Sequence, residues 1–107
     1  MTRIIALFNL RPGVDPKIYE DWARKTDLAT VRNLKSVDAF NVYRSAAVLG
    51  SEETPPYQYF EILDIGDMAL LGEEAQAAAM QKVVKEFHEL ADNPRLIIVN
   101  DIEQNEA

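Results

Sequence analysis

The sequence predicts one α+β domain with a ferredoxin-like fold, in which a four-stranded antiparallel sheet carries its helices on one face. Three observations lead to this prediction. The segments follow the order βαββαβ, the first and last strand segments are apolar on both sides, and 107 residues suffice for a single core. We therefore expect residues 1–107 to form one domain that pairs with a second copy as a dimeric α/β barrel.

The first strand is expected over residues 3–10, because both alternating sets of its side chains are largely apolar. A strand with this pattern is usually covered on both sides. Its apolar run stops at Asn9, and Arg11-Pro12 follows without a small-residue cleavage site, which argues against a signal peptide. Arg11-Pro12-Gly13 instead predicts a turn.

The first helix is expected over residues 16–33. Asp15-Pro16 marks its start, since Asp caps free amide groups and Pro suits the first helical turn. We expect one face of the helix to carry Ile18, Trp22 and Ala29. A second possible cap at Thr26-Asp27 predicts a bend there.

The second and third strands are expected over residues 36–45 and 57–65, where β-branched and aromatic residues are frequent. Between them, residues 46–56 contain Gly50 and Pro55-Pro56. This polar segment is too long for a tight turn and predicts an exposed hairpin loop.

The last third of the chain predicts a helix and a strand. Asp67 can cap a short helical turn through residue 71, and a longer helix is expected over residues 73–91. Its apolar stripe has helical spacing and consists of Met80, Val83, Val84, Phe87 and Ala91. Asn93-Pro94 is expected to end this helix, and residues 95–103 to form the last strand before a polar tail.

We expect the first and last strands to lie in the middle of the sheet, because both are apolar on two sides. The sheet face without helices then cannot be left in water. Self-association is the commoner way to cover such a face, and a larger partner protein is the alternative.

Composition restricts the possible partners. The net charge is −7 and the eleven Lys and Arg residues are scattered, which argues against nucleic acid and anionic membrane surfaces. No cysteine is present, so neither a disulfide nor a thiolate site can form. With one histidine and no Asp-rich loop we expect no metal, and no nucleotide-binding motif is found. We expect a cytoplasmic, cofactor-free protein.

Five segments that span nearly the whole chain form a familiar pattern: Ile4–Leu10, Tyr19–Trp22, Thr30–Leu34, Phe40–Arg44 and Glu86–Pro94. Together they resemble the RedY-like/HapK family of prodigiosin-type pigment pathways. The resemblance implies a dimeric α/β barrel with a ligand pocket between sheet and helices, acting beside enzymes that build pyrrole- or indole-derived metabolites. Related barrels include cofactor-free monooxygenases, isomerases and cyclases, so the reaction stays open.

Two residues are candidates for proton transfer. His88 is the only histidine and lies at the edge of the apolar stripe of the long helix, where it could serve as a general base. Glu61 shares a strand face with Tyr59, and burial there would raise the pKa of its carboxyl group. The alternatives are a half-exposed surface histidine and a solvated acid at the rim of an edge strand.

Further residues are candidates for substrate binding. Asn9 and Asn100 are expected to be neighbours in the sheet, where their amides could orient a carbonyl or pyrrole N–H group; ordinary sheet-end hydrogen bonding is the alternative. The aromatic candidates, which could stack on a conjugated ligand or belong to the core, are Tyr19, Trp22, Phe40, Tyr43 and Tyr59, with the core favoured for Trp22 and Phe40. Arg32 and Arg44 rank low, because many acidic residues are available for surface pairs.

These observations lead to one main functional prediction and two alternatives. The main one is a biosynthetic protein that binds a hydrophobic heteroaromatic intermediate and assists cofactor-free acid–base chemistry. The first alternative is a non-catalytic carrier or scaffold that docks other pathway enzymes. The second is a cofactor-independent small-molecule monooxygenase.

Overall fold

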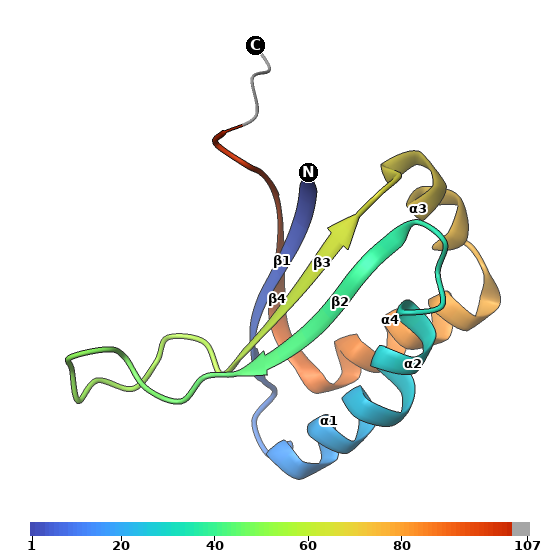
Figure 1. Ribbon diagram of the computed structural model, residues 1–107. Coiled ribbons are helices and arrows are strands. Elements are labelled where there is room, and N and C mark those ends of the chain that lie inside the picture. The colour runs from blue at the N-terminus through green and yellow to red at the C-terminus, as the bar shows by residue number, and fades with distance from the viewer. Residues whose placement is uncertain (104–107) are drawn as a thin grey trace.

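The computed structural model describes residues 1–103. The elements follow in the order β1 (Thr2–Leu10), α1 (Pro16–Trp22), the π-helical segment η1 (Ala23–Asp27), α2 (Leu28–Val31), β2 (Val37–Arg44), β3 (Tyr59–Ile65), α3 (Met68–Glu74), α4 (Ala78–Leu90) and β4 (Ala91–Asn100). The helices lie on one face of the sheet, and the β2–β3 loop extends away from the body (Figure 1). The predicted βαββαβ order is confirmed, while the predicted polar tail after Glu103 lies outside the described residues.

All strand pairs are antiparallel, and the strand order is β2-β3-β1-β4. The prediction that the last strand lies in the middle is therefore wrong, because β1 and β3 are central and β4 is an edge. On β4, Leu96 and Ile98 are 57% and 60% exposed. The apolar side chains of β4 are thus left exposed by the single chain.

The first helix differs from the prediction in the face that it buries. Ile18 is exposed, and the buried positions are Tyr19, Ala23, Asp27 and Val31. Residues spaced by four drift around an α-helix by about 40° at each step, because a turn takes 3.6 residues. The wider turn of η1 offsets this drift, so one face keeps all four positions buried.

The long helix ends earlier than expected, at Leu90. Its last carbonyls are satisfied by Arg11, whose backbone N–H donates to Leu90 O at 2.9 Å and whose Nε donates to Ala91 O at 3.2 Å. Asn93-Pro94 does not end the helix but lies within β4, beside a register shift opposite Leu7 and Asn9. A proline is tolerated there because β4 is an edge strand, and Asn93 adopts φ 46°, which Asn accepts readily.

The core lies between the helices and the sheet. Phe8 on β1 is fully buried and packs edge-on against Phe87 of α4 at 4.9 Å and Tyr19 of α1 at 5.4 Å between ring centroids. A second cluster fills the other end of the same layer with Val31, Val37, Phe40, Ile65 and Met80. Two packed groups therefore fix α1 and α4 against the sheet.

The opposite face of the sheet carries no helix (Figure 1). Directly opposed residues share a face, which groups Ile5 with Ile62 and Ile97, and Leu7 with Phe60. None of these side chains is fully buried, and Ile97 is 48% exposed. This helix-free face is therefore an apolar surface that the single chain leaves open.

Candidate functional site

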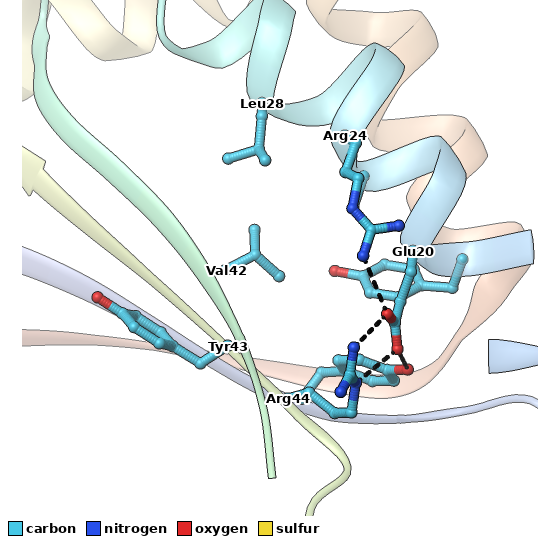
Figure 2. A pocket seen from close by; sticks show the side chains of 9 residues that line it. Glu20, Arg24, Leu28, Val42, Tyr43 and Arg44 are labelled. Carbon is cyan, nitrogen blue, oxygen red and sulfur yellow. Dashed lines mark hydrogen bonds and ion pairs between the residues drawn. The ribbon is translucent and has the colours of Figure 1, made fainter. Parts of the chain in front are cut away.

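A cavity of about 150 Å³ lies between the α1–η1–α2 segment and the strands β2 and β3. Figure 2 shows Leu28 and Val42 facing each other across it, while the ring of the adjacent Tyr43 points away from this pair. Successive side chains on a strand point to opposite faces, which explains the different directions of Val42 and Tyr43. The remaining lining residues are Tyr19, Glu20, Ala23, Arg24, Arg44 and Tyr59.

An ion pair closes one side of this cavity. Arg44 donates from Nε and Nη2 to the two carboxylate oxygens of Glu20 at 2.8 and 2.7 Å (Figure 2). The hydroxyl of Tyr59 donates to the same carboxylate at 2.7 Å, and Arg24 Nη2 at 3.4 Å. The hydrogen bonds from Arg44 and Tyr59 lower the pKa of Glu20 to about 2, so its carboxylate is ionised at neutral pH.

A second polar group lies deeper, between the same helix and the sheet. Glu61 on the central strand β3 is 7% exposed, and Asp27 at the end of η1 is 4% exposed. Tyr19 donates its hydroxyl hydrogen to Glu61 Oε2 at 3.0 Å, and this contact is buried. Three polar side chains from α1, η1 and β3 thus meet inside an apolar layer.

The two carboxyl groups influence each other, and their pKa values are both raised. Burial, followed by the negative charge of Asp27 and the hydrogen bond between the carboxyls, holds the pKa of Glu61 well above its ordinary value. Burial also raises the pKa of Asp27 to about 6. Near neutral pH the pair therefore retains a proton, which is held mainly by Glu61 and bonded to the Asp27 carboxylate.

Asp27 is a site residue that sequence reasoning did not identify. The sequence predicts a possible helix cap at this residue, yet its backbone lies in the π-helical segment and its side chain is buried in the core. Its Oδ2 receives no hydrogen bond from the other residues described. The available signal was the four-residue spacing of Tyr19, Ala23 and Asp27, followed by Val31, which places one acid among apolar neighbours.

Tyr19 connects the carboxyl pair with the cavity. It is fully buried, lines the cavity, and donates to Glu61. Burial and the nearby charge of Glu61 strongly raise the pKa of its phenol, so Tyr19 stays protonated and acts as a hydrogen-bond donor. A proton can move between the cavity and Glu61 only if the Tyr19 oxygen gains one proton as it gives up another.

A second cavity of about 240 Å³ lies on the other side of Arg44, at the base of the β2–β3 loop. It is bordered by Pro16, Ser45, Thr54, Pro55, Tyr57 and Gln58, in addition to Arg44 and Tyr59. Arg44 and Tyr59 therefore belong to both cavities.

Of the aromatic residues named from the sequence, Tyr19, Tyr43 and Tyr59 line the first cavity. Trp22 lies beside it without lining it. Its ring stacks on Phe87 at 6.3 Å, and its Nε1 donates to Glu86 Oε1 at 2.9 Å. The structure thus brings Tyr19 and Tyr59 together, with ring centroids 4.6 Å apart, whereas the ring of Tyr43 is 48% exposed and points away from them (Figure 2).

The structure does not bring His88 to this site. His88 is exposed on α4, and its Nδ1 lies 2.8 Å from the carbonyl oxygen of Val84 on the same helix. Because the apolar stripe of α4 faces the sheet through Val83 and Phe87, the next position points outward. His88 and Glu61 are therefore on different sides of the helix layer.

Asn9 and Asn100 are also apart. Asn9 pairs opposite Asp92, whereas Asn100 pairs opposite Thr2 at the other end of β1, because β1 and β4 run antiparallel. Asn9 anchors the β2–β3 loop: it donates to Pro56 O at 3.1 Å and accepts from the Gln58 backbone N–H at 2.9 Å. The expected pair of neighbouring amides is thus not formed.

Arg44 was ranked low from the sequence but lies at the centre of the site, whereas Arg32 donates to Phe40 O and Asn41 away from it. Sequence alone could not tell the two arginines apart, since both have acidic residues nearby in the chain. Within residues 1–103 no three acidic or histidine side chains gather in a way that would hold a metal ion. No helix in the same range is long and apolar enough to cross a membrane.

Comparison with known proteins places these features in a family. The chain matches the family described as REDY-like protein HapK over residues 2–102. Comparison with curated proteins gave no match.

Among solved structures, HapK from Hahella chejuensis is similar with a TM-score of 0.77 and 24% identity, covering 100% of this chain and 98% of that one. A dimeric protein of unknown function and ferredoxin-like fold from Bacteroides fragilis has a TM-score of 0.66 at 13% identity, covering 94% and 95%. SnoaB, a cofactor-independent oxygenase from Streptomyces nogalater, has a TM-score of 0.74 at 10% identity, covering 99% and 97%. At these identities the likeness shows a shared ferredoxin-like fold. The family match spans nearly the whole chain, and the protein therefore belongs to the family of the REDY-like protein HapK.

Proposed function

We propose that the protein acts in the biosynthesis of a prodigiosin-type metabolite, where it binds a hydrophobic heteroaromatic intermediate and assists cofactor-free acid–base chemistry. Family membership supports the biosynthetic role. The observation that carries the chemistry is the buried group of Glu61, Asp27 and Tyr19, which adjoins a cavity with aromatic walls. Such a cavity, with a few convergent polar groups, is typical of a small-molecule site.

In the proposed reaction Tyr19 relays a proton between the ligand and Glu61. When the ligand loses a proton to the Tyr19 oxygen, Tyr19 passes its own proton to the pair of Glu61 and Asp27, which then holds two protons, and the reverse sequence protonates a ligand. Because burial and then the charge of Asp27 raise the pKa of Glu61, its carboxyl group holds a proton more tightly than an exposed acid does. Glu61 therefore takes the role of general acid and base, and Asp27 positions its proton.

A carrier function is the second candidate, and one observation favours it. Neither Glu61 nor Asp27 lines the cavity, and only Tyr19 links them to it. A protein that only shields an unstable intermediate would need the cavity but not the ionisation of Glu61. Such a carrier binds its ligand and returns it unchanged to another pathway enzyme.

We propose further that the working unit is a homodimer joined through the helix-free face. The apolar side chains of Ile5, Leu7, Phe60, Ile62 and Ile97 support this, since a face of this kind is rarely left in water. The structural likeness to a dimeric protein from Bacteroides fragilis points the same way. In such a dimer the cavity beside Tyr19 would lie, in each subunit, on the helix-covered face of the sheet and away from the interface.

Gene deletion in the producing organism, followed by metabolite profiling, tests the function. We expect loss of a pyrrole- or indole-derived product and accumulation of its precursor. Complementation with the wild-type gene should restore the product, whereas Glu61→Gln should not. His88→Ala is the matched test of the sequence-based candidate, and we expect it to restore the product because His88 is exposed.

The outcomes separate the alternatives. If Glu61→Gln restores the product while Leu28→Trp, which fills the cavity, does not, the carrier function is correct. Oxygen consumption by the purified protein during turnover would indicate the monooxygenase alternative. An unchanged metabolite profile after deletion would refute a biosynthetic role.

A further inference from the structure

Two neighbouring cavities share one wall. Their volumes are about 150 and 240 Å³, and both are lined by Arg44 and Tyr59. Each is smaller than the range of about 300–1,000 Å³ that is usual for ligand sites, whereas their joint volume falls inside it. The residues between them therefore determine whether a drug-sized ligand can be accommodated.

Arg44 lines both cavities, its ion-pair partner Glu20 lines the first, and the two partners are held unequally. The side chain of Glu20 is 17% exposed, whereas that of Arg44 is 64% exposed. Glu20 also accepts the hydroxyl hydrogen of Tyr59 at 2.7 Å, a contact that does not depend on Arg44. Arg44 is the more exposed partner and is therefore the one that can move into solvent.

Movement of Arg44 leaves the ionised carboxylate of Glu20 in the first cavity, at the side where Arg44 had separated it from the second. The same cavity is lined by Tyr19, Tyr59, Leu28 and Val42, whose surfaces are largely apolar. The carboxylate then keeps the hydroxyl of Tyr59 and the 3.4 Å contact from Arg24, but it needs a new donor in place of the two hydrogen bonds from Arg44. An anionic ligand cannot supply one and would be repelled, while a ligand N–H group can.

We propose that Glu20 recognises the N–H group of an elongated, flat heteroaromatic ligand, which displaces Arg44 and lies across both cavities. This inference rests on the proposed function and specifies its ligand: a pyrrole- or indole-type ring with a free N–H. Tyr19 and Tyr59 supply flat surfaces beside the carboxylate. A ring with oxygen in place of N–H would supply no donor in place of Arg44 and would bind more weakly.

Two isosteric probes, 2-phenylindole and 2-phenylbenzofuran, test the proposal by NMR titration of the isotope-labelled full chain. We expect wild-type protein to bind the indole about tenfold or more tightly than the benzofuran, because a hydrogen bond to a charged group is lost with the latter. The indole should shift signals of Leu28 in one cavity and Thr54 in the other. Glu20→Gln should reduce the preference, since a neutral acceptor forms a weaker bond.

Asp21→Asn is the matched control. Asp21 lies next in the chain and also pairs with Arg24, at 3.5 Å, but does not line the cavity, so its replacement should leave the preference unchanged. Arg44→Gln should bind both probes more tightly, because no guanidinium then competes for the space or for Glu20. This variant keeps the test valid if Glu20→Gln does not fold.

Equal affinity of wild-type protein for the two probes would overturn the role of Glu20 while leaving ligand binding intact. Shifts confined to one cavity would refute the joint site. If neither probe binds to the wild type or to Arg44→Gln, both this inference and the proposed ligand class are wrong. Loss of product with Glu61→Gln, together with equal probe affinities, would retain the proposed function and reject only the recognition by Glu20.

Discussion

Replacement of Asp27 by Asn should stabilise the protein at neutral pH. The Asp27 carboxyl is 4% exposed and shares its surroundings with Glu61, so its negative charge is unfavourable in the folded state. Asn has nearly the same shape and carries no charge. Its amide can also donate to Glu61, where the Asp carboxylate can only accept.

The size of the effect follows from the pKa of Asp27, which burial raises from 3.8 to about 6. An acid with a raised pKa binds its proton more tightly when folded, so the free energy of unfolding falls as pH rises from the unfolded value towards the folded one. At about 1.4 kcal/mol per pH unit, the loss between about pH 4 and about pH 6 is about 3 kcal/mol. Asp27→Asn should recover up to this amount above pH 6.

Urea denaturation from about pH 4 to about pH 8 measures this directly. We expect the two proteins to be similar near pH 4 and to diverge as pH rises, with the free energy of unfolding of the variant higher by up to about 3 kcal/mol at neutral pH. Glu89→Gln, which removes an exposed acid on α4, should follow the wild type throughout. If the free energies of unfolding of wild type and Asp27→Asn run parallel against pH, or if the variant is less stable at pH 7.5, the inference that Asp27 is a destabilising buried charge is refuted.

Three further predictions concern other parts of the molecule. Arg44→Gln should remove most of the interaction that holds the pKa of Glu20 at about 2, below its ordinary value of 4.5. In the wild type this lowered pKa raises the free energy of unfolding above pH 4.5, and the contribution is lost as pH falls towards 2. The free energies of unfolding of wild type and variant should therefore converge in acid denaturation. Ile97→Asp places a charge on the helix-free face and should convert the proposed dimer to monomer in analytical ultracentrifugation; a dimer that persists would move the interface elsewhere. Asn9→Ala removes two hydrogen bonds to the β2–β3 loop and should cost about 1–2 kcal/mol, with faster hydrogen exchange at the Gln58 amide; unchanged exchange would contradict the anchoring role.

The order of elements was predictable because each segment carries a local signal. Asp15-Pro16 does start α1, with Asp15 accepting from the Lys17 backbone N–H at 2.9 Å, and Asp67 caps α3 in the same way through Leu70. The position of β4 in the sheet was not predictable from its composition. A strand that is apolar on both faces is expected to be covered on both sides, but the pattern does not distinguish a covering surface of the same chain from one of another chain.

Within the candidate site, the sequence could place only those residues whose side-chain direction follows from the alternation along a strand. Alternation along residues 57–65 grouped Glu61 with Tyr59, and both do face the helices. The positions of His88, Asn9 and Asn100 depended on helix rotation and on strand direction, which the sequence pattern did not determine. A shift of one residue around a helix moves a side chain by about 100°, enough to turn His88 from the sheet to solvent.

The π-helical segment η1 explains why Asp27 was not predicted as a site residue and why its side chain is buried. In an uninterrupted α-helix the drift of four-residue steps would carry Asp27 and Val31 away from the face of Tyr19, and Asp27 would be a solvated acid or a cap. The wider turn keeps Asp27 on the buried face, where its Oδ2 has no other donor in residues 1–103 and its carboxyl meets Glu61. Such insertions are frequent at functional sites. The irregular helix and the paired carboxyls are therefore one feature, because the wider turn buries an acid at a position that a regular helix would turn towards water.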